Sequence, residues 1–138
     1  MLRTLAQVGA VNVGEPRAVR AKSGLSGIDK RPAAGPVRVT IPDRGRSGLD
    51  CDTICDTHNH GGPRQAVYAF ARGDLDWWEA RLDRTLPDGT FGENLTTLGF
   101  DISGARLGEQ WRVGSDLVLS VTGPATKTAK RFAAHRGD

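Results

Sequence analysis

Residues 65–71 read QAVYAFA, and this short apolar run decides which folds are open to the chain. A run of this length fits a buried strand, because helices need longer periodic segments. The spacing of the apolar residues then changes to that of a helix, because Leu75, Trp78 and Leu82 would share one helical face. Asp74 can cap this helix. We therefore expect a buried strand followed by one helix, which residues 87–89 (PDG) end.

Further strands are expected on both sides of this unit. Alternating or dense apolar residues predict strands over residues 6–13, 37–41, 111–113 and 117–122, with a weaker candidate over 17–22. Residues 114–116 (GSD) would join the last two strands as a hairpin. Residues 42–63 hold few apolar side chains and are expected to form a long loop, while residues 95–100 are ambiguous.

The composition favours one mainly-β domain. The 138 residues suffice for a single domain over 1–138, and 18 glycines with 7 prolines argue against a helix bundle. Several short strands with one clear helix predict a barrel or a sandwich. No apolar run approaches the ~20 residues of a membrane span. The first residues lack the layout of a signal peptide, so we expect a cytoplasmic protein with no membrane partner.

Charge is unevenly distributed along the chain. Residues 1–50 hold nine Lys and Arg against four Asp and Glu, whereas residues 51–110 hold five against ten. A basic N-terminal third can face an anionic ligand. The basic residues are scattered and aromatic residues do not interleave with them, so we expect no nucleic-acid partner.

The loop over residues 51–60 combines two cysteines with two histidines, Cys51, Cys55, His58 and His60. These are the ligand types of zinc, but structural zinc sites draw their ligands from two separated segments. We therefore assign no metal ligand here, although a zinc loop stays open as an alternative. A disulfide between the two cysteines is not expected in the cytoplasm.

Three short motifs carry groups that can bind a polar ligand. His60, Gly61 and Gly62 precede a proline, and glycines let backbone N–H groups approach an anion, although a plain turn explains them equally well. Asn94 offers a donor and an acceptor, as a heterocycle edge requires, or it completes an ordinary turn. Lys30 and Arg31 lie in a Gly/Pro loop, where they bind a phosphate or form an exposed basic loop.

Taken together, the segments GIDKRPAAGPV (27–37), GLDCDTICD (48–56), HGGPRQAVYAF (60–70), DLDWWEARL (74–82), FGENLTT (91–97) and VTGPAT (121–126) resemble the MOSC domain. This domain type forms the C-terminal part of molybdenum-cofactor sulfurases and also occurs as small bacterial stand-alone proteins. The resemblance extends from about the first strand to Pro124. It implies a mainly-β, MOSC-type β-barrel with one or two short helices, shortened at its C-terminal end.

The resemblance also implies a cofactor and the residues that bind it. The cofactor is the molybdenum cofactor, molybdopterin, a pterin with a phosphate and a dithiolene that holds the metal. Cofactor-binding positions fall on Lys30, Arg31, His60, Gly61, Gly62 and Asn94. Asp52 and Asp56 match the family's acidic loop positions, whereas Arg64 stands where an acidic residue is common.

One family feature is absent from its expected place. After the proline that matches Pro124, the family carries a Pro-Cys pair, and here that pair falls on Lys127 and Thr128. A threonine hydroxyl cannot replace a thiolate as nucleophile or soft metal ligand.

Two functions therefore stay open. One is cofactor-dependent sulfur transfer or reduction of N-hydroxylated compounds, as in a sulfurtransferase or an oxidoreductase. The other is non-catalytic binding of a small molecule or a protein.

The resemblance further implies partners. Many MOSC domains work beside a pyridoxal-phosphate-dependent cysteine desulfurase, which this chain is too short to contain. A desulfurase or a redox partner would then be a separate protein.

Overall fold

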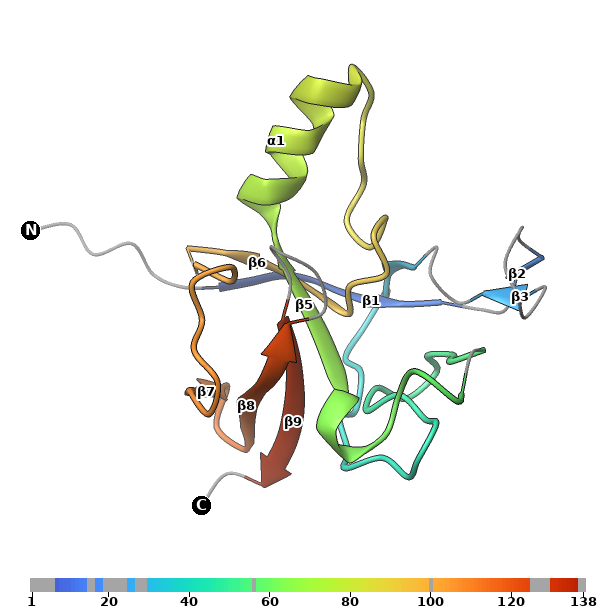
Figure 1. The fold of residues 1–138 in the computed structure, drawn as a ribbon, viewed down its shortest axis with the longest axis vertical. Coiled ribbons are helices and arrows are strands. Elements are labelled where there is room, and N and C mark those ends of the chain that lie inside the picture. Colours follow the sequence, from blue (N-terminus) through green and yellow to red (C-terminus); the bar gives the residue numbers. More distant parts are fainter. Residues whose placement is uncertain are drawn as a thin grey trace, which may run out of the picture.

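The computed structural model describes residues 7–14, 17–18, 25–26, 30–55, 57–99, 101–124 and 130–136. The described part is mainly β, as predicted, with a seven-stranded sheet and one α-helix (Figure 1). The strand order is β4-β1-β6-β5-β9-β8-β7. The strands are β1 (Gln7–Val13), β4 (Arg31–Pro32), β5 (Val67–Ala71), β6 (Leu95–Leu98), β7 (Gln110–Val113), β8 (Leu117–Pro124) and β9 (Lys130–Arg136). A separate two-stranded ribbon pairs β2 (Arg17–Ala18) with β3 (Leu25–Ser26).

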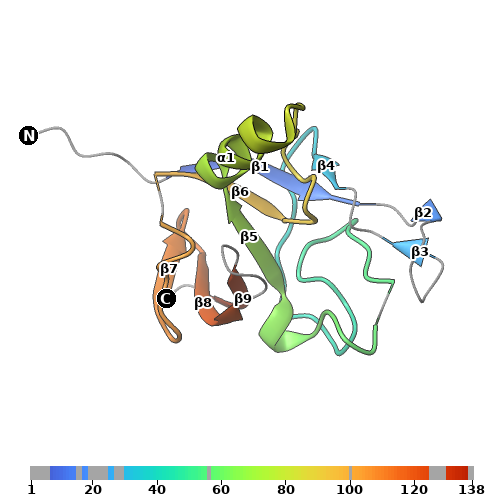
Figure 2. The same cartoon turned by 45° about the horizontal axis from the view of Figure 1, so that its top comes forward.

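The sheet bends into a half-barrel. Figure 2 shows β7, β8 and β9 to the left of β5, whereas β1 and β6 cross β5 at its upper end, next to helix α1. β5 pairs in parallel with β6 and antiparallel with β9, so it lies in the middle of the sheet. The concave side holds the main core, which is formed by Leu49, Ala66, Val67, Ala69, Leu95, Ile102, Leu119, Val121, Phe132 and Ala134.

β5 is buried on both faces, which explains its dense apolar sequence. Val67 and Ala69 point into the main core, while Phe70 packs with Leu75 and Leu86 in a second cluster. Successive side chains of a strand point to opposite faces, so one short strand serves both clusters. The strand predicted over residues 65–71 is thereby confirmed, with a 3₁₀ turn at Pro63–Gln65 before it.

Helix α1 (Arg72–Leu82) differs from its prediction at both ends. It begins directly after β5 with Ala71 as its N-cap, so Asp74 lies in the first turn and does not cap it. It ends at Asp83, which adopts a left-handed conformation, before the predicted stop at residues 87–89. Of the predicted apolar face, only Leu75 is buried, and Trp78 and Leu82 are exposed.

Other strand predictions have mixed outcomes. β1 and the β7–β8 hairpin are confirmed, and the ambiguous residues 95–98 form β6. The strand predicted over residues 37–41 is wrong, because Val39 makes only an isolated bridge to Leu49. β9 was not predicted, and most of the weak candidate over residues 17–22 lies outside the described residues. Within the described chain, no helix combines the length and the apolar character that crossing a membrane requires.

Candidate functional site

A buried carboxylate joins three of the sequence motifs. Asp52 Oδ1 accepts hydrogen bonds from Lys30 Nζ at 2.6 Å and from the Gly14 N–H at 2.9 Å. Its Oδ2 accepts from Asn94 Nδ2 at 2.9 Å. The Lys30 side chain is 6% exposed and that of Asp52 is fully buried. Lys30, Asp52 and Asn94 therefore meet at one point, although they come from three separate segments of the chain.

Asn94 is held so that its amide uses both of its functions. Its Oδ1 accepts from the Tyr68 N–H at 3.0 Å, while its backbone N–H donates to the Tyr68 carbonyl at 2.8 Å. Its carbonyl accepts from the Asn12 N–H at 2.6 Å. Position 94 thus connects β1 with β5 and points an amide donor at Asp52. An aspartate here would place a second carboxylate beside Asp52, which explains why the position needs an amide.

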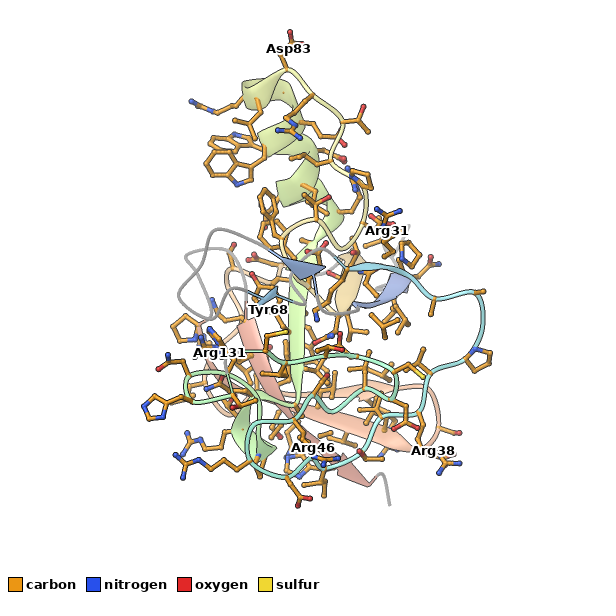
Figure 3. The ribbon with its side chains drawn as sticks, turned by 90° about the vertical axis from the view of Figure 1, so that its right-hand side faces the viewer. Arg31, Arg38, Arg46, Tyr68, Asp83 and Arg131 are labelled. Atoms are coloured by element: carbon orange, nitrogen blue, oxygen red, sulfur yellow. The ribbon has the colours of Figure 1, made fainter. Side chains whose placement is uncertain are left out.

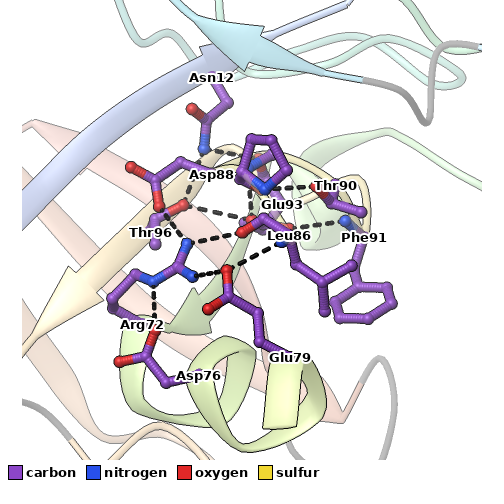
Figure 4. Close-up of polar contacts among 12 residues, drawn as sticks. Asn12, Arg72, Asp76, Glu79, Leu86, Asp88, Thr90, Phe91, Glu93 and Thr96 are labelled. Atoms are coloured by element: carbon purple, nitrogen blue, oxygen red, sulfur yellow. Dashed lines mark hydrogen bonds and ion pairs between the residues drawn. The ribbon is translucent and has the colours of Figure 1, made fainter. Parts of the chain in front are cut away.

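Glu93 organises the turn beside this point (Figure 4). Its Oε1 accepts from the Gly89 N–H at 2.6 Å and from Thr96 Oγ1 at 3.2 Å, and its Oε2 accepts from the Phe91 N–H at 3.1 Å. Burial raises the pKa of Glu93, and these hydrogen bonds offset part of that effect. A β-carbon at Gly89 would lie 2.4 Å from the Lys30 carbonyl oxygen, so only glycine fits there.

Asn12 completes the cluster, and Asn12, Lys30, Asp52, Glu93 and Asn94 together are called the polar centre below. Asn12 Nδ2 donates to the Glu93 carbonyl at 3.2 Å and to Thr96 Oγ1 at 3.0 Å. Its Oδ1 is buried and has no hydrogen-bond partner. A buried acceptor without a donor is costly, so a small donor placed against this atom would be stabilising.

Arg72 fixes the segment that follows the helix. Its guanidinium donates to the Leu86 carbonyl and to the carboxylates of Asp76, Glu79 and Asp88 at 2.7–2.9 Å (Figure 4). Desolvation opposes the charge of this guanidinium, but the neighbouring carboxylates prevail and raise its pKa. Arg72 therefore ties helix α1 to the turn that Glu93 holds.

The glycine motif lies away from the polar centre. Gly61 has a positive φ, and a β-carbon there would lie 2.8 Å from backbone atoms of Arg46. The Gly62 N–H donates to the Arg46 carbonyl at 2.8 Å. Figure 3 shows Arg46 at the lower end of the molecule, well below Arg31, the neighbour of Lys30. The structure thus brings Lys30 and Asn94 together and leaves Gly61 and Gly62 in a separate turn.

The remaining site residues are exposed or lie outside the described chain. Arg31 and His60 are exposed, as is Arg64. Asp56, Lys127 and Thr128 fall outside the described residues. Cys51 and Cys55 are free thiols, and the part of the chain that the structure describes holds no group of three or more His, Cys, Asp or Glu suited to a metal ion.

Sequence reasoning missed Asn12, Glu93 and Gly89. The available signal was the FGEN motif itself, whose glutamate follows two nearby glycines.

A family model for the MOSC domain matches residues 56–134, more than half of the chain. The chain belongs to the MOSC domain family. Among curated proteins, the uncharacterized protein YflK of Bacillus subtilis (strain 168) is 33% identical to this MOSC domain over 128 residues. The match covers 89% of this chain and 55% of YflK, so the chain spans about half the length of that relative.

Solved structures share the fold of this MOSC domain. The crystal structure of YiiM from Geobacillus stearothermophilus has a TM-score of 0.69 at 24% identity, and the match covers 96% of this chain and 69% of YiiM. The crystal structure of a hypothetical protein has a TM-score of 0.65 at 19% identity, with 92% of this chain and 60% of that chain covered. The MOSC-type fold expected from the sequence motifs is therefore confirmed.

Proposed function

We propose that this MOSC domain binds the molybdenum cofactor beside the polar centre, with the anionic end of the cofactor on Arg31. One observation carries the proposal: Lys30 and Asn94 converge on the buried carboxylate of Asp52, and each of the three stands in a different motif of the family. A fold needs no such expensive buried ion pair for stability alone, since apolar residues of similar size do as well or better.

The residues fit the polar part of such a cofactor. Arg31 is exposed directly after Lys30, and a guanidinium forks onto phosphate oxygens. The polar centre also holds Asn12 Oδ1, a buried acceptor without a hydrogen-bond partner that a single small donor such as water would pair with. Lys30 is already neutralised by Asp52, so its role is to hold the acidic loop against β1.

When bound, the cofactor would supply a metal that exchanges sulfur or oxygen and carries electrons. The chain's own residues orient it: Lys30 and Asn94 position the loop of Asp52, and Glu93 shapes the adjoining turn. Sulfur transfer or reduction of N-hydroxylated compounds is the proposed chemistry. A separate cysteine desulfurase or redox protein would provide the sulfur or the electrons.

The test measures molybdenum and pterin in chain purified from a host that makes the cofactor. We expect bound molybdenum, and at least a tenfold loss of affinity for the cofactor in Arg31→Ala, because a charge-assisted hydrogen bond contributes about 1.5–3 kcal/mol. Arg38→Ala removes another exposed arginine and serves as the matched control. Molybdenum no higher than in chain from a cofactor-deficient host contradicts the proposal.

A second candidate, non-catalytic binding, is favoured by the hydroxyl of Thr128 where the family carries a thiol. Thr128→Cys separates the two functions in cofactor-loaded protein with an electron donor added. If the chain is an impaired enzyme, the variant gains turnover of an N-hydroxylated substrate that the natural sequence lacks. Unchanged inactivity with cofactor still bound supports the binding module.

A further inference from the structure

The outer face of helix α1 carries a large exposed apolar patch. Trp77 is 49% exposed, Trp78 37% and Leu82 48%. The two indoles meet edge to face with their centroids 4.9 Å apart, and the Arg81 guanidinium lies 4.2 Å from the Trp77 ring. Tryptophan is usually well buried, and clustered exposed aromatic residues mark interaction surfaces.

The helix presents this patch away from the sheet. Figure 1 shows α1 rising from the end of β5, and Figure 3 shows Asp83 at its far tip. The inner face is already occupied, since Leu75 is buried there. Arg72 holds the returning segment through Asp88 and the Leu86 carbonyl, and Glu79 accepts a hydrogen bond from the Leu86 N–H. The apolar residues of the outer face therefore contribute little to the fold of the described chain.

The charges of the outer face are arranged to fit a second copy of it. At 100° per residue, Asp74, Trp77, Trp78, Arg81 and Leu82 fall on one continuous face. The midpoint between Asp74 and Arg81 is the midpoint between Trp77 and Trp78. A two-fold axis through that point places each indole against the other and each acid against an arginine, as a self-complementary interface requires.

The base and the tip of the helix continue this complementarity. Burial raises the pKa of Asp74, and the nearby negative charge of Asp101 raises it further. None of the ion pairs found in the described residues involves Asp74. At the tip, Arg84 is exposed just beyond Arg81. The helix is about 16 Å long. Antiparallel packing would bring Arg81 and Arg84 at the tip of one helix to Asp74 and Asp101 at the base of the other.

We propose that two copies of this chain associate through helix α1, packed antiparallel, with Trp77 against the partner's Trp78 and Asp74 against the partner's Arg81. This association is independent of cofactor binding, because the face lies on the opposite side of the helix from Arg72 and the polar centre. The interface is small, so the two copies exchange between monomer and dimer.

The test is sedimentation of the full chain over a range of concentrations. We expect a monomer–dimer equilibrium for the natural sequence and at least a tenfold higher dissociation constant for Trp78→Ala, because a central tryptophan carries much of the energy of an interface. Asp74→Arg and Arg81→Asp each set like charges against each other and are expected to weaken the dimer by a similar factor. Arg38→Asp reverses an exposed charge elsewhere and is expected to leave it unchanged.

Mixing the two charge-reversal variants gives the decisive result. In the mixed dimer, one contact pairs two natural residues and the other pairs two reversed ones, so both become attractive again. We expect the equimolar mixture to dimerise more tightly than either variant alone, with circular dichroism confirming that both are folded. A monomer at every concentration overturns the proposal, as does a mixture no tighter than its components.

Discussion

The buried ion pair between Lys30 and Asp52 makes each partner depend on the other. Lys30→Met leaves the Asp52 carboxylate buried without its cation, which we expect to cost about 3–5 kcal/mol of unfolding free energy. Asp52→Asn is also destabilising, but the double variant should lose much less than the sum of both. Urea denaturation of the four chains in a double-mutant cycle measures this coupling. Strictly additive losses would show that the pair does not act as a unit.

Glu93 links stability to pH. Because burial raises its pKa in the folded chain, that chain keeps a proton at pH values where the unfolded chain has released it. The contribution of Glu93 to stability is therefore largest below its unfolded pKa and falls as pH rises through the raised one. Glu93→Gln cannot titrate, so the stability of the natural chain relative to this variant should decline over that window. Unfolding curves at several acidic to neutral pH values test this, and a constant difference contradicts it.

Individual site residues were predictable only in part. Lys30, Asp52 and Asn94 stand in recognisable motifs, but contacts between residues 22 or 42 positions apart depend on how the strands cross. Asn12 reads as an exposed polar residue of an alternating strand, yet it is fully buried. The burial of Glu93 could not be predicted from the sequence either. It depends on the turn of Gly89 and Phe91, which folds back so that its N–H groups donate to the carboxylate.

Two glycines around helix α1 have opposite requirements. A β-carbon on Gly73 would have no neighbouring heavy atom within 4 Å, so we expect Gly73→Ala to stabilise the chain by about 0.4–1 kcal/mol. Gly89 has a φ of +89° and no room for a side chain, so Gly89→Ala should destabilise it by more than that. Thermal unfolding of both variants provides the comparison. Shifts of the same sign would contradict this description of the helix and its turn.

Elements were predictable where local pattern and pairing agree. The β5 run and the β7–β8 hairpin met both conditions. Residues 37–41 alternate like a strand because Val37 and Val39 pack against the core, but they find no continuous partner. β9 was missed for the converse reason: its inward residues are Phe132 and the small Ala134, set among charged residues, and its two neighbouring strands make it regular.

The whole molecule depends on the strand that joins its two parts. Phe132 on β9 is fully buried and its ring lies 4.9 Å from that of Trp111 on β7. Phe132→Ala is expected to cost about 3–5 kcal/mol, since it empties the centre of the core. His135→Ala changes an exposed residue of the same strand and should stay within about 0.5 kcal/mol of the natural chain. Equal effects in denaturant would contradict the central place of β9.

The position of β9 also has a consequence for protein synthesis. In the described sheet, β9 separates β4-β1-β6-β5 from the hairpin of β8 and β7. The ribosome makes the chain from its N-terminus, so both parts emerge before the strand that connects them. Until then the hairpin has no ladder to join, and the exposed edges of β5 and β8 are open to wrong partners. A chaperone that shields those edges during translation would therefore act before β9 arrives, and pairing of that strand would end its task.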